Sequence, residues 1–226
     1  MGYLLLEGGA EFGGRMRDPD LRALELAGGF EAPIRIIPTA AAPDNNDQRA
    51  GNNGIRWFES LGAKDVASLP IIDKVTASDE SIAKSLRESR LIYMLGGFTG
   101  YLGETLKGSA AWQAVLDAYA RGAVVGGSSA GAMVMCGFYY DPSRGQVVDG
   151  LNLLPNAIVM PHFNTFGKSW ASRLLEIPHV TLIGIDEGTG MLDDSAGAWT
   201  VHGGGNVTLY RGGQVEIYKA GKSFSV

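Results

Sequence analysis

The chain has 226 residues, of which 45% are hydrophobic and 19% charged, and its formal net charge is −5. This length and composition predict one globular domain over residues 1–226. The weak negative charge and the lack of any run of lysine or arginine argue against nucleic acid or an anionic membrane as a partner. No stretch approaches the ~20 apolar residues that cross a bilayer. Residues 1–6 lack the basic start of a signal peptide, so we expect a cytoplasmic protein.

Short apolar runs alternate with helix-compatible stretches along most of the chain. The runs, each followed by glycine, proline, histidine, serine or an acid, cover residues 3–6, 34–37, 91–95, 124–125, 157–160 and 182–185. The helix-compatible stretches cover residues 20–27, 54–61, 78–88, 111–120 and 168–175, and residues 66–72 are a further candidate strand. This alternation predicts a three-layer, doubly wound α/β fold with a mostly parallel sheet.

The pattern changes after residue 191. Three short alternating runs at residues 198–202, 207–210 and 215–218 are separated by glycine-rich turns. They predict a C-terminal antiparallel β-meander. Because ligands of open α/β sheets bind beyond the carboxyl ends of the strands, the residues that follow the predicted strands are the candidate site residues.

One strand end carries a candidate nucleophile. The apolar run 123–125 leads into Gly127, Ser129 and Gly131, which together form a G-x-S-x-G pattern followed by small, helix-compatible residues. In a nucleophile elbow, a sharp strand-to-helix turn exposes the serine hydroxyl, and its neighbours must be small because the backbone is crowded. A tight packing turn in which a serine only caps the helix is the alternative interpretation.

A serine hydroxyl needs a base, and the chain has three histidines. His162 follows the run 157–160, at the sheet edge where we expect Ser129. His179 precedes a predicted strand and belongs at the opposite edge, and His202 ends a run of the predicted meander. His162 is therefore the favoured base.

The base in turn needs an acid that orients its ring. Glu187 follows the run 182–185 at the same edge and alternates away from Asp186, which makes it the favoured acid. Asp149 and Asp186 remain alternatives. Cys136, the single cysteine, lies in an apolar run and is expected to be a buried packing residue.

Two backbone N–H groups are candidates for an oxyanion hole. Ala130 directly follows Ser129 at the expected start of a helix, where N–H groups are free to bind an anion. Gly97 lies in a glycine loop after the run 91–95, where a backbone N–H can approach a ligand closely. Thr99 of the same loop is a candidate substrate contact. The loop lacks the spacing of the glycine motifs that bind phosphate.

Taken together, these motifs resemble the peptidase S51 family, which contains aspartyl dipeptidase (peptidase E) and cyanophycinase. The similar segments are Gly-Gly-Ser-Ser-Ala-Gly-Ala at 126–132, Pro-His-Phe at 161–163, Gly-Ile-Asp-Glu-Gly-Thr at 184–189 and Gly-Leu-Asn-Leu-Leu at 150–154. The resemblance implies a class I glutamine amidotransferase-like fold and a serine peptidase with Ser129 as nucleophile and His162 as base. It implies Glu187 as the acid by analogy with aspartyl dipeptidases, or Asp149 by analogy with cyanophycinases.

Two departures from the family pattern bear on the substrate. Phe98 stands where the family's glycine loop commonly has Asn or Asp, and the arginine-rich segment with which cyanophycinases hold their polymer is reduced to Lys168 and Arg173. We therefore expect a dipeptidase or exopeptidase acting on small peptides, including those with N-terminal aspartate, and not a cyanophycinase. Arg173 is the candidate partner for the substrate carboxylate.

No cofactor and no metal ion is expected, and a homodimer is compatible with the sequence. The competing interpretations are a glutamine amidotransferase relative, disfavoured because Ser129 and not cysteine occupies the elbow, and a non-catalytic ligand-binding protein of the same fold.

Overall fold

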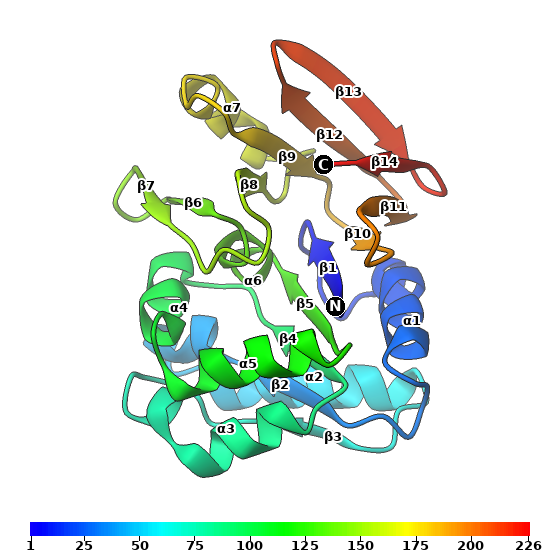
Figure 1. The fold of residues 1–226 in the computed structure, drawn as a ribbon, viewed down its shortest axis with the longest axis vertical. Coiled ribbons are helices and arrows are strands. Elements are labelled where there is room, and N and C mark those ends of the chain that lie inside the picture. Colours follow the sequence, from blue (N-terminus) through cyan, green and yellow to red (C-terminus); the bar gives the residue numbers. More distant parts are fainter.

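The computed structural model describes residues 1–226 and contains an eight-stranded sheet, a four-stranded sheet and a two-stranded hairpin (Figure 1). The large sheet has the strand order β14-β11-β10-β1-β5-β4-β2-β3. Its strands are β1 (Tyr3–Glu7), β2 (Ile34–Ile37), β3 (Val66–Ser68), β4 (Leu91–Met94), β5 (Val124–Ser128), β10 (Thr189–Asp193), β11 (Ala198–Gly203) and β14 (Ser223–Ser225). β1, β5, β4, β2 and β3 run parallel, and β10, β11 and β14 add an antiparallel edge beside β1.

Seven α-helices connect the strands or follow them. They are α1 (Arg17–Leu26), α2 (Asp47–Ser60), α3 (Glu80–Arg87), α4 (Thr99–Leu106), α5 (Ala110–Ala120), α6 (Ala130–Val134) and α7 (Ala171–Leu174). Side-chain caps begin two of them: Asp79 accepts hydrogen bonds from the first turn of α3, and Ser109 does so for α5. Short 3₁₀ turns cover residues Gly14–Met16, Thr39–Asp44, Thr76–Ser78 and Gly167–Trp170. None of these helices has the length and apolar composition of a membrane-spanning segment.

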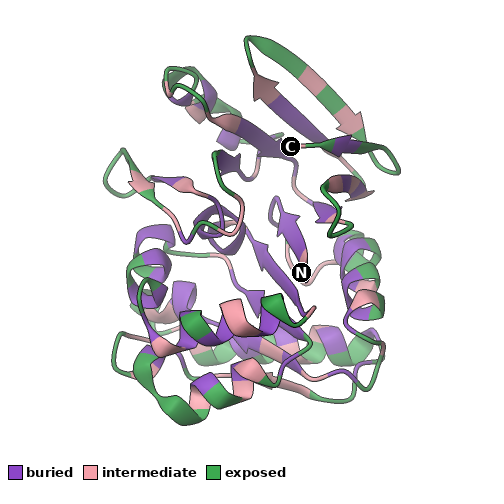
Figure 2. Ribbon diagram, viewed as in Figure 1, coloured by how far each residue is buried: buried purple, intermediate pink, exposed green.

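Apolar residues on both faces of the sheet produce the three layers. Along β1, Leu4 and Leu6 pack into one hydrophobic cluster with α3, α4 and α5, whereas Leu5 packs into a second cluster with α1 and α2. Side chains alternate between the two faces of a strand, so a strand that is apolar at every position must be covered on both sides. Figure 2 shows the result, with buried strands inside and exposed surface on the outer sides of the helices.

The smaller sheet has the order β13-β12-β9-β8 and is built from β8 (Ala157–Met160), β9 (Thr181–Ile185), β12 (Asn206–Arg211) and β13 (Gln214–Lys219). β8 and β9 run parallel, and β12 and β13 extend the sheet antiparallel. A separate hairpin pairs β6 (Phe138–Asp141) with β7 (Gln146–Asp149).

Two sequence expectations about the sheets need correction. The predicted strands 157–160 and 182–185 exist but do not join the large parallel sheet, because antiparallel β10 already occupies the free edge of β1. The predicted C-terminal meander is wrong as one unit. Its first run, β11, pairs with β10 and β14 in the large sheet. Gly204 and Gly205 then carry the chain to the smaller sheet, where β12 and β13 form a hairpin.

Two buried carboxyl groups lie close together at the end of β1. Glu7 at the end of β1 and Asp20 on α1 are both fully buried. The Tyr93 hydroxyl donates to Glu7 Oε2, and Trp57 Nε1 donates to Asp20 Oδ2 at 2.7 Å. Burial, followed by repulsion from Asp20, raises the pKa of Glu7 well above its ordinary value, and burial raises the pKa of Asp20 to about 7.

These groups should make stability depend on pH. In the unfolded chain Glu7 and Asp20 release their protons near their ordinary pKa values of 4.5 and 3.8. In the folded protein Asp20 has a pKa of about 7, and the pKa of Glu7 is raised well above its ordinary value. The folded state therefore binds more protons in this range, so the free energy of unfolding should fall as the pH rises from about 4 to about 7. Glu7→Gln imitates the protonated carboxyl, so the free energy of unfolding of this variant should fall less steeply with pH. Urea unfolding at a series of pH values measures this slope. Glu59→Gln, at an exposed position of α2, is the matched control. Equal slopes for the wild type and Glu7→Gln would contradict the prediction.

Candidate active site

Ser129 lies at the junction of β5 and α6 in a backbone conformation that few residues adopt. Its φ of 49° and ψ of −111° fall outside the ordinary regions, which costs about 1–3 kcal/mol and persists only where the surrounding structure imposes it. The surroundings do so here: the Ser129 N–H donates to Glu7 O at 3.0 Å, and Met133 N–H donates to Ser129 O at 3.0 Å. A Cβ at Gly127 would lie 2.6 Å from the backbone of Gly131, so only glycine fits this turn. Ser129 thus stands between a strand and a helix, as the predicted nucleophile elbow requires.

His162 follows β8 and also has a positive φ, of 51°. The backbone N–H of His162 donates to Gly8 O at 2.7 Å, which fixes the start of this loop beside the end of β1. The imidazole lies between Gly9 and Phe166: the Phe166 ring stacks on it at 4.8 Å, and a Cβ at Gly9 would lie 2.3 Å from Cε1. The ring therefore has little room to rotate or shift.

The structure brings Ser129, His162 and Glu187 together. His162 Nε2 is 3.1 Å from Ser129 Oγ, and His162 Nδ1 is 2.8 Å from Glu187 Oε1. Asn164 helps to hold Glu187, because its Oδ1 accepts the Glu187 N–H at 2.9 Å. When Nδ1 carries the proton and donates it to Glu187, the lone pair of Nε2 faces the serine hydroxyl. This arrangement can remove a proton from the hydroxyl.

The two alternative acids lie elsewhere. Asp149 is at the end of β7 with its side chain 76% exposed, and its nearest cation is Lys107, at 3.9 Å. Asp186 accepts from the backbone and side-chain amides of Asn206, at 2.9 and 3.1 Å. Both ring nitrogens of His162 are already engaged by Ser129 and Glu187, so neither aspartate contacts the ring.

The other histidines and the cysteine lie away from Ser129. His179 lines a separate cavity beside α7 and the β12–β13 turn, and His202 Nδ1 lies 3.3 Å from Asp18 Oδ2. Cys136 is fully buried, and burial raises the pKa of its thiol to about 12. A thiol in this state is not a nucleophile near neutral pH, which agrees with the packing role predicted for it.

The two predicted oxyanion donors lie in the segments that flank Ser129. Ala130 is the first residue of α6, so its N–H has no partner within the helix. Gly97 follows β4, and its N–H donates no hydrogen bond within the protein. The neighbouring Gly96 abuts the nucleophile, because a Cβ added to it would lie 3.2 Å from Ser129 Cβ. Neither N–H group has a hydrogen-bond acceptor within the protein.

The two predicted substrate contacts have partners inside the protein. Thr99 is buried, and its hydroxyl faces Met133 Sδ at 3.7 Å, so its side chain joins α4 to α6. Arg173 donates to the Tyr140 hydroxyl at 2.8 Å, and its guanidinium lies over the Tyr140 ring. Neither side chain contacts Ser129, His162 or Glu187.

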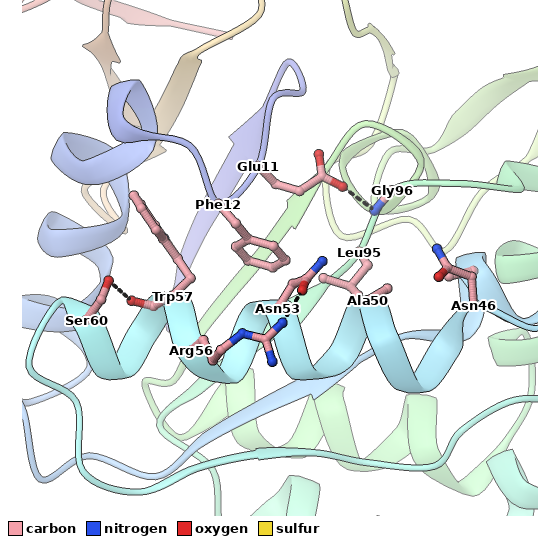
Figure 3. A pocket seen from close by; sticks show the side chains of 11 residues that line it. Glu11, Phe12, Asn46, Ala50, Asn53, Arg56, Trp57, Ser60, Leu95 and Gly96 are labelled. Atoms are coloured by element: carbon pink, nitrogen blue, oxygen red, sulfur yellow. Dashed lines mark hydrogen bonds between the residues drawn. The ribbon is translucent and has the colours of Figure 1, made fainter.

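Sequence reasoning missed a polar cavity beside the nucleophile. The cavity has a volume of about 610 Å³ and extends from Glu11 and Gly96 along α2, past Asn53 and Arg56 (Figure 3). Glu11 follows the end of β1, so the strand-end rule that selected the other candidates could have selected it as well. A second cavity, of about 330 Å³, lies on the other side of the glycine loop and includes Gly97 and Thr99. Nowhere do three or more His, Cys, Asp or Glu side chains gather in a way that could hold a metal ion.

A serine hydroxyl in contact with an imidazole, at the carboxyl edge of a largely parallel sheet covered by helices, is the arrangement of an α/β serine hydrolase. The comparisons with known proteins give the family. Peptidase family S51 matches residues 4–197. The chain belongs to peptidase family S51, and it is a serine peptidase.

Individual relatives agree with this assignment. The cyanophycinase of Geminocystis herdmanii is 30% identical over 201 residues, which cover 82% of this chain and 72% of that protein. The crystal structure of a peptidase from an acI-B1 Actinobacterium superimposes with a TM-score of 0.90 at 30% identity, covering 100% of this chain and 97% of that one. A protein from Listeria monocytogenes EGD-e assigned to peptidase E has a TM-score of 0.64 at 22% identity, over 97% and 98% of the two chains, and so shares the fold.

Proposed function

We propose that the protein cleaves small peptides through a Ser129–His162–Glu187 triad and an acyl-enzyme. The observation that carries this proposal is the unbroken contact from hydroxyl to imidazole to carboxylate, at 3.1 and 2.8 Å. Each distance is within hydrogen-bond range before any substrate is bound.

In the first half of the reaction, Ser129 Oγ attacks the scissile carbonyl carbon as its proton passes to His162 Nε2. Glu187 stabilises the imidazolium through the Nδ1–H bond. The carbonyl oxygen becomes an oxyanion, for which the Gly97 and Ala130 N–H groups are the proposed donors. The C–N bond then breaks, and the leaving amine takes the proton from Nε2.

In the second half, water replaces the amine. His162 Nε2 takes a proton from the water molecule as its oxygen attacks the acyl carbon. The bond from that carbon to Ser129 Oγ then breaks, and the proton returns from Nε2 to the serine. The cycle leaves both side chains in their starting state.

The proposed substrates are dipeptides and other short peptides, including those with N-terminal aspartate. Two cavities of about 610 and 330 Å³ flank the glycine loop beside Ser129, and volumes of this order suit small ligands. For Arg173 to bind the substrate carboxylate, its guanidinium would have to leave Tyr140.

The amidotransferase-like fold class, a homodimer and a cytoplasmic location stay predictions.

The similarity to cyanophycinases raises cyanophycin as a second candidate substrate. Of the cationic positions with which cyanophycinases hold their polymer, the segment after His162 keeps only Lys168 and Arg173, and this reduction favours small peptides as the substrate.

A serine-directed fluorophosphonate followed by peptide mass spectrometry tests the chemistry. We expect one label per chain, on Ser129, and no label in His162→Ala at matched time. A panel of dipeptides with and without N-terminal aspartate, together with cyanophycin, tests the substrate by the release of free amino groups. Failure of the probe to label Ser129 would overturn the mechanism. Faster cleavage of cyanophycin than of any dipeptide would overturn the substrate proposal alone.

A further inference from the structure

We propose that Glu11 is a substrate-binding residue that accepts the free α-ammonium group of the substrate's first residue. This inference rests on the proposed function, because it concerns the substrate that Ser129 would attack. It makes the protein an exopeptidase that selects peptides by their unblocked N-terminus.

The position of Glu11 relative to the nucleophile is the first support. Glu11 Oε2 accepts from the hydroxyl of Ser128, the residue before the nucleophile, at 2.9 Å. Glu11 Oε1 accepts from the Gly96 N–H at a long 3.3 Å, and Gly96 abuts Ser129 (Figure 3). The carboxylate therefore contacts two residues that adjoin Ser129, one in sequence and one in space.

The charge of Glu11 is the second support. No lysine, arginine or histidine forms an ion pair with it. Its two donors, a hydroxyl and one backbone N–H, are neutral, and a carboxylate has about four acceptor sites. A carboxylate that is partly exposed in a cavity and lacks a protein cation can bind a cationic ligand group through charge-assisted hydrogen bonds.

Distance favours an α-ammonium over the side chain of a lysine or arginine. The α-nitrogen of a residue is two bonds from its carbonyl carbon, whereas a lysine ammonium stands at the end of a four-carbon stem. Because Glu11 contacts the residues that adjoin Ser129, it matches the shorter spacing.

The rest of the cavity then accommodates the side chain of the first residue. Beyond Glu11 the cavity is lined by the amides of Asn46 and Asn53 and by Arg56, with Phe12 and Trp57 as apolar walls. The hydrogen-bond donors at this end suit an acidic or polar side chain. The cavity thus offers an anion close to the nucleophile and donors farther away.

A matched pair of substrates tests the proposal: an Asp-Leu dipeptide and its N-acetyl derivative, compared by kcat/KM. The wild type should prefer the free amine by at least about 100-fold, since the blocked peptide cannot form the ion pair and leaves the Glu11 carboxylate without a cationic partner. Glu11→Gln keeps the shape and can keep both protein hydrogen bonds but removes the charge. It should raise KM for the free dipeptide by about 10- to 100-fold and leave the acetylated peptide within about threefold.

Three further measurements separate this role from a structural one. Glu11→Asp retains the charge and should retain a preference for the free amine. Glu59→Gln should leave both substrates unchanged, and thermal unfolding of each variant reports on folding. Fluorophosphonate labelling of Ser129 is measured in parallel, so a protein that does not label contradicts the proposed function itself. If Ser129 labels normally, the Glu11 proposal is overturned by equal wild-type rates on the two peptides, by cleavage of neither, or by an equal loss on both in Glu11→Gln.

Discussion

Replacing Ser129 by alanine should lower kcat for a dipeptide substrate by about 10⁴- to 10⁶-fold while leaving the fold intact. The hydroxyl is the only nucleophilic group within hydrogen-bond reach of His162 Nε2, so its removal leaves no group to form an acyl-enzyme. Any remaining rate would come from substrate binding and oxyanion donors acting on water.

The stability of this variant should change little or increase. Alanine has no hydroxyl to position, and the surrounding backbone hydrogen bonds at Glu7 O and Met133 N remain. Initial rates at saturating peptide, together with a thermal melt, make the measurement. Cys136→Ala is the control. The Cys136 thiol is buried and its hydrogen-bond partner is Ala132 O, so the variant should leave kcat within about threefold of the wild type. Activity of Ser129→Ala within tenfold of the wild type would refute the assignment.

Replacing Glu187 by glutamine should cost up to about 10⁴-fold in kcat, the size of the effect in the serine-protease template. Glutamine keeps the shape of the side chain. Its amide, however, can donate to Nδ1, and this favours the tautomer that places the proton on Nε2, where it faces Ser129. The variant also loses the negative charge that stabilises the imidazolium.

Asp149→Asn is the matched comparison. Asp149 is exposed on the β6–β7 hairpin and faces Lys107, so its replacement should change kcat by less than about tenfold. A pH–rate profile of each variant, measured with the same dipeptide, reveals a change in the base even where residual activity is small. A larger loss in Asp149→Asn than in Glu187→Gln would show that the acid has been misassigned.

Much of the local structure could be predicted from residue patterns. The strands at 34–37 and 157–160 match β2 and β8 at both ends, and the predicted helix at 111–120 differs from α5 by one residue. Helix α2 begins at Asp47, seven residues before the predicted start, because its first two turns are polar and have no apolar stripe to reveal them. The pattern succeeded where burial produced a periodic apolar sequence.

The site followed from a different rule. Ser129, His162 and Glu187 were each chosen because they follow a predicted strand, and the structure places them in contact although β5 belongs to one sheet and β8 and β9 to another. The three side chains meet across the two sheets because the backbone hydrogen bond from His162 N–H to Gly8 O brings the end of β8 beside the end of β1.

The sequence by itself determined the strand-to-helix turn at Ser129, the candidate base, a short list of candidate acids and most of the strands. These depend on neighbouring residues: small side chains where the turn is tight, and apolar runs where strands are buried. Only the tertiary structure decided which strands share a sheet, that Glu187 and not Asp149 contacts His162, and that Glu11 stands in a cavity beside the nucleophile. Each of these depends on pairing between distant segments. Several strands could pair with the same sheet edge, and several carboxylates could contact the same histidine, on the basis of their local sequence alone. The packing of the whole chain decides which of them do so.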